Sequence, residues 1–108
     1  MARTLKFNIA GQSIEQDPNC DFSGLVPGTE GYLKVEFTFS PEWDGCVKAA
    51  VFNIGAPGGE YAAVLKDGKS CDIPDAVCGR PAFKVYVYGQ NKDFHIKSDE
   101  IIIRQNGR

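Results

Sequence analysis

The groups best suited to metal binding or nucleophilic chemistry in this sequence are four cysteines and a single histidine. Cys71 and Cys78 are separated by six residues, whereas paired zinc ligands usually stand about two to four residues apart. His95 is the only imidazole, and we interpret it as an exposed residue at the end of a strand, within the segment DFHIK. Neither a GxSxG turn nor a cysteine-protease signature is present. The sequence therefore predicts no metal site, no catalytic nucleophile and no cofactor.

Two pairs of acidic residues could in principle act as the acid and base of a glycosidase. Asp72 and Asp75 flank Pro74, and Glu42 and Asp44 flank Trp43. Glycosidases hold two carboxylates at a set separation across a sugar-binding cleft. A chain of 108 residues with short loops has no room for a deep cleft, so we interpret these carboxylates as solvated turn residues. We expect the protein not to be an enzyme.

Aromatic residues are the remaining candidates for a binding surface. Tyr86 and Tyr88 lie on one face of a predicted strand, and Tyr61 lies on another strand. Exposed together, these tyrosines would suit a protein interface or a sugar ring, because the ring is apolar and its tip is polar. The alternative is that residues 15–31 cover them. Trp43 is interpreted as a core plug rather than a ligand platform.

Short strands are the elements that must position these side chains. The segment 32–45, YLKVEFTFSPEWDG, alternates apolar and polar residues up to Ser40-Pro41, which indicates a strand with one buried face and one wet face. Turn signals recur at about ten-residue spacing. At most a single helical turn is expected, at 74–77. Strands are predicted over 3–9, 32–39, 47–54, 61–66, 69–73, 82–88 and 100–104, with a further extended piece at 22–26. The pattern predicts one all-β domain over 1–108, an immunoglobulin-like β-sandwich of about seven antiparallel strands.

Charge and hydropathy exclude several classes of partner. Twelve basic and fourteen acidic side chains give a net charge of −2, which disfavours nucleic-acid binding through the phosphate backbone. The N-terminal segment has no apolar h-region, and no apolar run approaches roughly 18 residues, so neither a signal peptide nor a membrane span is expected. Synthesis in a cytoplasm predicts reduced thiols at the four cysteines, namely Cys20, Cys46, Cys71 and Cys78. A disulfide between Cys71 and Cys78 is the alternative.

The order of the motifs resembles a small module of tailed-phage and prophage virion proteins. The resemblance rests on YLKVEFTFSPEWDG, KAAVF, EYAAVLKDGKSCDIPDAV, PAFKVYVYG and a terminal isoleucine strand, and it extends over about residues 5–104. It implies an immunoglobulin-like fold and a structural or attachment role in a virion, as a tail, baseplate or capsid-decoration component. It also implies that Trp43 anchors the turn by packing against Phe37 and Phe52. It brings no catalytic residues.

From this resemblance we expect a non-enzymatic virion protein, made in the cytoplasm of the host bacterium, whose partners are other virion proteins. One alternative is a carbohydrate-binding attachment module for host glycans, with Tyr86, Tyr88 or Trp43 stacking on sugar rings. Another is a small inhibitor of a host defence protein. Homo-oligomerisation is also expected, because sheet edges offer unpaired backbone groups. The candidate edges are the first strand, Leu5–Ile9, and the last strand, Glu100–Arg104.

Overall fold

The computed structural model describes residues 3–55 and 59–105. This part of the chain contains nine strands, one short α-helix and one 3-10 turn. In chain order they are β1 (Arg3–Ala10), β2 (Ser13–Gln16), β3 (Leu33–Phe39), the 3-10 turn η1 (Pro41–Trp43), β4 (Val47–Asn53), β5 (Glu60–Val64), β6 (Ser70–Asp72), α1 (Asp75–Cys78), β7 (Ala82–Gln90), β8 (His95–Lys97) and β9 (Ile101–Arg104).

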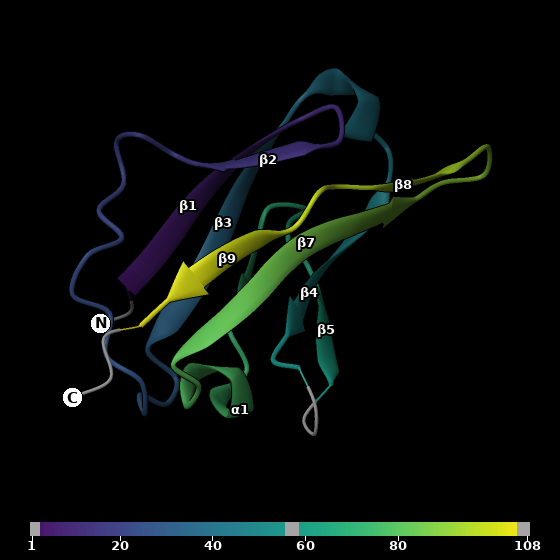
Figure 1. Cartoon of the computed structure of the whole chain (residues 1–108). Coiled ribbons are helices and arrows are strands. Elements are labelled where there is room, and N and C mark those ends of the chain that lie inside the picture. The colour runs from purple at the N-terminus through teal and green to yellow at the C-terminus, as the bar shows by residue number, and fades with distance from the viewer. Residues whose placement is uncertain (1–2, 56–58, 106–108) are drawn as a thin grey trace.

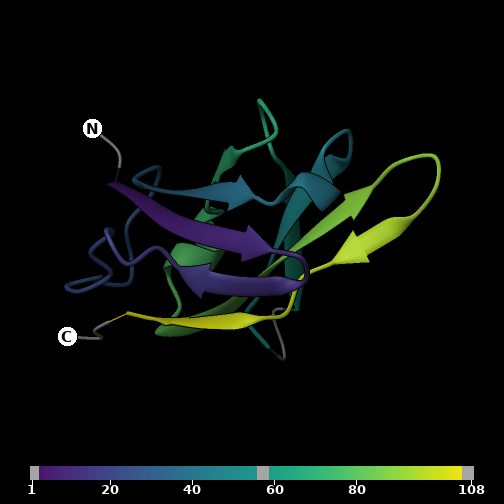
Figure 2. The ribbon, with the colours of Figure 1, turned by 90° about the horizontal axis from the view of Figure 1, so that it is seen from above.

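The strands form two sheets that pack face to face (Figure 1). The four-stranded sheet has the order β2-β1-β3-β6. The five-stranded sheet has the order β5-β4-β7-β8, and β9 also pairs with β7. Viewed from above, the hairpin of β7 and β8 extends past the body of the sandwich (Figure 2). The predicted all-β sandwich is confirmed, while its assignment to the immunoglobulin class stays a prediction.

Alternate residues of the strands build the core, as a period of two predicts. β1 and β3 place Phe7 opposite Phe37, and the two rings stack with their centroids 5.5 Å apart. The five-stranded sheet contributes Phe52 and Phe83, whose rings meet edge to face at 6.3 Å. The largest fully buried side chains are Trp43, Phe7, Phe37, Phe52, Leu5, Ile9, Ile73, Ile103, Val35, Val77, Val85 and Val87.

Four details differ from the sequence prediction. β2 and β8 bring the number of strands to nine, and the extended piece expected at 22–26 is loop. β1 pairs in parallel with β3 instead of antiparallel, because the chain reverses into β2 and the loop at 17–32 then returns it to the starting end. β1 is therefore not an edge strand, since β2 and β3 flank it on both sides.

The helical turn expected at 74–77 agrees with the structure, where it is present as α1.

Trp43 is a fully buried core plug, as predicted, but its surroundings differ from the expected ones. The turn η1 directs the indole towards the turn between β1 and β2, where Nε1 donates a hydrogen bond of 2.8 Å to the carbonyl oxygen of Gly11. Its aromatic partner among the described residues is Phe39, at 5.2 Å between ring centroids. Phe37 instead pairs with Phe7 and Phe39, and Phe52 pairs with Phe83. The indole thus closes one end of the sandwich.

Candidate functional site

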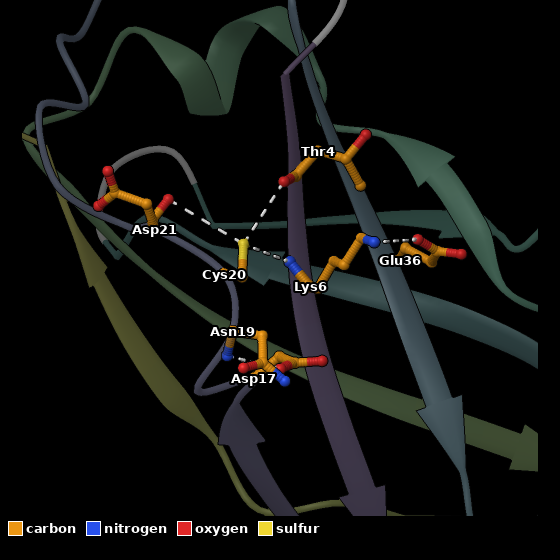
Figure 3. Close-up of polar contacts among 7 residues, drawn as sticks. All are labelled: Thr4, Lys6, Asp17, Asn19, Cys20, Asp21 and Glu36. Atoms are coloured by element: carbon orange, nitrogen blue, oxygen red, sulfur yellow. Dashed lines mark hydrogen bonds and ion pairs between the residues drawn. The ribbon is translucent and has the colours of Figure 1, made fainter.

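The outer face of the four-stranded sheet is a charged surface. Lys6 on β1 stands opposite Glu36 on β3, with Nζ and Oε1 3.9 Å apart (Figure 3). Lys34 on β3 stands opposite Asp72 on β6, with Nζ and Oδ1 3.2 Å apart. Exposed cross-strand ion pairs of this kind contribute little to stability, but they keep a sheet face hydrated. This face has the character of a solvent surface.

The outer face of the five-stranded sheet instead carries an apolar patch over β5, β4 and part of β7, bordered by an exposed ion pair in which Nζ of Lys84 lies 3.9 Å from Oε1 of Glu100. Val64, Ala49 and Tyr88 form one row across β5, β4 and β7, and the next row consists of Ala62, Val51 and Tyr86. Val47 begins β4 on the same face and is 69% exposed, while Val64 is 64% exposed. We call this surface the apolar outer face; its members are Val47, Ala49, Val51, Ala62, Val64, Tyr86 and Tyr88.

Tyr86 lies at the polar border of the apolar outer face and is held by charged neighbours. Its hydroxyl donates a hydrogen bond of 3.4 Å to Oε2 of Glu60, which also accepts one of 3.3 Å from Nδ2 of Asn53. Partial burial, and next the carboxylate of Glu60, raise the pKa of Tyr86, so its hydroxyl stays a donor. The ammonium of Lys97 lies over the ring, 4.5 Å from the centroid. Tyr86 is therefore a fixed side chain with one ring face occupied.

Tyr88 lies beside a shallow groove. Its hydroxyl is 2.7 Å from Nδ1 of His95, so His95 rests on Tyr88 at the predicted strand end and is exposed there. The groove measures about 410 Å³, and Val47, Ala49, Tyr88 and Gln90 contribute to its lining. An apolar floor with polar tips at the rim is the usual composition of a protein interface.

Tyr61 does not share a face with the other two tyrosines. It stands opposite Phe52 and packs, half-buried, against the core. The structure therefore brings together two of the three predicted tyrosines. Residues 15–31 pack elsewhere: Phe22 meets Phe7 edge to face at 5.3 Å, and the guanidinium of Arg3 donates to the carbonyl oxygens of residues 21 and 23. That loop covers an end of the core and leaves the apolar outer face open.

The cysteines are all free thiols, including Cys71 and Cys78. Burial raises the pKa of Cys71 to about 11 and also raises the pKa of Cys78, which makes both thiols poor nucleophiles. Cys20 is only half-buried, and Figure 3 shows its sulfur beside β1, where it accepts from the N–H of Lys6 at 3.4 Å and donates to the carbonyl oxygen of Thr4 at 3.6 Å. Within the described residues, no three His, Cys, Asp or Glu side chains are grouped as metal ligands would be.

The acidic pairs considered as glycosidase groups occupy exposed turn and strand-end positions. A hydrogen bond from Ser40 lowers the pKa of Glu42, which is the opposite of what a general acid requires. Asp72 is engaged with Lys34, and Oδ1 of Asp75 accepts the backbone N–H of Gly31 at 2.9 Å. These carboxylates have the structural surroundings of turn residues.

The sequence predicts the tyrosines of the apolar outer face but not its exposed aliphatic residues, Val47 and Val64. The sequence of β4, VKAAVFN, is nearly continuously apolar, and the strand lies between β5 and β7 in its sheet. A strand that is apolar on both faces is normally covered on both faces. In the part of the chain that is described, the core covers Ala50 and Phe52, whereas Val47 remains exposed. That mismatch was the available signal for a contact surface.

Comparison with protein-family models, with curated proteins and with solved structures returned no match. In the described part of the chain, no helix has the length and hydropathy that crossing a membrane requires.

Proposed function

We propose that this chain is a non-enzymatic structural or accessory protein of a phage particle, and that it acts by protein–protein contact through the apolar outer face. The observation that carries the proposal is the group of exposed apolar side chains on the outer face of the five-stranded sheet, where the charged pair of Lys84 and Glu100 lies only at the border. Lys6 and Lys34 on one face have acidic partners, while Val47 and Val64 on the other are among the most exposed apolar side chains. Apolar surface gathered on one face is typical of an interaction site.

The details of the apolar outer face favour a protein partner. Ala49 and Ala62 place short side chains at its centre, and Val51 between them is only 7% exposed. Tyr86 and Tyr88 flank this centre, and their hydroxyls already have partners. Tyrosine anchors around a small-residue centre lose little conformational entropy on binding. The assignment to a phage particle rests on the resemblance of the motifs and their order.

The glycan-binding alternative has weaker geometric support. A sugar ring needs an open aromatic face, and Lys97 occupies one face of Tyr86. Trp43, the third candidate for stacking, is fully buried. Tyr88 is the remaining candidate, so a glycan array with the wild type and Tyr88→Ala tests this function directly. Saturable glycan binding that Tyr88→Ala abolishes would favour the alternative over protein contact.

Mass spectrometry of purified particles tests the proposed function. We expect the chain in particles of the phage or prophage that encodes it, at a constant copy number per particle. A null strain complemented with Val47→Lys should incorporate less of the chain, because a charge is placed on the contact face. Thr38→Lys is the matched control, since Thr38 is exposed on the opposite outer face. Absence of the wild-type chain from particles would refute the proposal.

A further inference from the structure

β5 is an edge strand whose backbone has one bonded side and one open side. Leu65 N–H bonds to the carbonyl oxygen of Lys48 at 2.9 Å, and this bond fixes which residues of β5 face β4. Odd-numbered residues of β5 direct their N–H and C=O groups to β4, so Glu60, Ala62 and Val64 direct theirs away from it. Lys66, the next even-numbered residue, also directs its N–H away from β4 and donates it to the carbonyl oxygen of Ser70. Among the described residues, the pairing partner of β5 is β4 alone.

Within β5 this edge lacks most of the devices that normally prevent edge-to-edge pairing, and the turn that bonds Lys66 to Ser70 begins only after the strand ends. Its sequence is EYAAV, with neither proline nor lysine, and its register with β4 runs without a bulge. The single charged residue, Glu60, already holds the hydroxyl of Tyr86 and the amide of Asn53. The other sheet has edges of four and three residues, β2 and β6. A bare, apolar edge of five residues is a template for another strand.

We propose that two copies of this protein associate by antiparallel pairing of β5 with β5, so that their five-stranded sheets join into one. The pairing centres on Ala62, which stands opposite Ala62 of the second copy, and Glu60 stands opposite Val64. Three open positions with the middle one on the two-fold axis make the edge self-complementary. Each of these three pairs exchanges two backbone bonds, which gives about six hydrogen bonds. The inference goes beyond the proposed function, because it concerns how copies of the chain associate, whatever they attach to.

Charge and shape favour a second copy as the occupant. The register separates the two Glu60 carboxylates by four residues along the strand, about 14 Å, which exceeds the screening length of about 8 Å at physiological salt. The row of Tyr86, Val51 and Ala62 continues across the axis into the same three residues in reverse order. The two apolar outer faces thereby become one continuous surface, with Ala62 of each copy at the centre of the joint and Glu60 beside Val64 at either end.

Sedimentation of the purified full chain tests the association. We expect concentration-dependent dimers between roughly 1 μM and 1 mM. Val64→Glu should weaken dimerisation at least about tenfold, because it places a carboxylate directly opposite Glu60 of the second copy at both ends of the pairing. Val47→Glu is the matched control: Val47 is similarly exposed on the same face but lies off the edge, and its effect should stay below about twofold. A wild type that remains monomeric, or equal weakening by both variants, overturns the proposal.

Cysteine cross-linking tests the register in a background where Cys20→Ser removes the half-buried thiol. Ala62→Cys should give a disulfide-linked dimer under mild oxidation, because directly opposed Cα atoms lie about 5.5 Å apart, within disulfide reach. Val64→Cys should give little of it, because its two copies would be about 14 Å apart. Equal cross-linking at both positions, or none at position 62, contradicts the pairing. Circular dichroism of each variant confirms the fold, and particle incorporation is measured separately, so failure here leaves the proposed function standing.

Discussion

Replacing Gly89 with alanine tests the packing of the tryptophan plug. Gly89 is a buried residue of β7, and a Cβ atom placed on it would lie 2.9 Å from Cε3 and from Cζ3 of Trp43. The same atom would lie 3.2 Å from Cγ2 of Ile96. Gly89 is paired with Lys48 on one side and Ile96 on the other, so the backbone cannot easily move away. The added methyl group must therefore displace the indole.

The expected cost follows from two opposing contributions. Overpacking of a close-packed core by a methyl group costs about 1–3 kcal/mol. Alanine reduces the conformational entropy of the unfolded chain, which offsets about 0.4–1 kcal/mol. We therefore expect Gly89→Ala to lower the free energy of unfolding by about 1–2 kcal/mol. At about 4–8 °C per kcal/mol for a domain near this size, the melting temperature should fall by about 5–15 °C.

Urea denaturation of four proteins measures this contact as a double-mutant cycle. The four are the wild type, Gly89→Ala, Trp43→Phe and the double variant. Trp43→Phe is destabilising by itself, because it leaves a gap and removes the hydrogen bond to Gly11. It also vacates the space that the methyl group needs, so Gly89→Ala should cost close to zero in that background. The expected coupling energy is about 1–2 kcal/mol.

Gly79→Ala is the matched control for the cycle. A Cβ atom on Gly79 would meet its nearest backbone atom at 3.9 Å, an ordinary contact, and the φ of −80° suits alanine. This variant should match or slightly exceed wild-type stability. Purely additive effects of Gly89→Ala and Trp43→Phe would refute the argument that the methyl group and the indole compete for one space.

Three further outcomes are expected. Ser98→Ala should lower the free energy of unfolding by about 1–3 kcal/mol in urea, because it leaves the buried N–H of Val87 without its 2.9 Å acceptor; exposed Ser13→Ala should have little effect. Stability should fall as pH rises from about 9 to 11, since folding raises the pKa of Cys71 from 9.0 to about 11 and the folded state retains a proton that the unfolded state releases. Cys71→Ala should flatten that slope in pH-dependent melts, and an unchanged slope would exclude this thiol as its cause. A disulfide reagent at pH 8 should modify Cys20 first, because the other three thiols are buried; a fast phase that persists in Cys20→Ser would contradict this.

Strand positions were predictable where the alternation of polarity is long. β3 and β7 alternate over seven and nine residues, and their burial follows that alternation. β2 and β8 were missed because four and three residues carry too little pattern. The parallel pairing of β1 with β3 depends on the route of the loop at 17–32, which local sequence does not specify. Whether a strand lies at the edge or in the centre depends on the order of all strands in the sheet. The sequence of β1 alone does not contain that order, so the prediction of β1 as an edge strand was wrong.

Of the residues in the candidate site, only Tyr86 and Tyr88 could be predicted from the sequence. Alternation within β7 separates Tyr86 and Tyr88 from the core side, and the structure agrees. The position of Tyr61 depends on the register between β5 and β4, which places it opposite Phe52. A one-residue change of register moves a side chain to the other face, so no argument from β5 alone could place it.

The exposed valines of the apolar outer face allow the contribution of a residue to binding to be measured apart from its contribution to folding stability. A side chain such as Val47 that stays 69% exposed recovers only a small part of the roughly 1.5 kcal/mol or more that full burial of a valine would contribute. The fold therefore gains little from an apolar residue there, and a polar one would serve the monomer as well. On the charged face, the corresponding exposed positions are held by an ion pair of Lys6 and Glu36 instead. Substitutions at Val47 and Val64 should consequently leave unfolding curves nearly unchanged. Those at Val47 should alter particle incorporation and those at Val64 dimerisation, so contact and stability can be measured independently in the same variants.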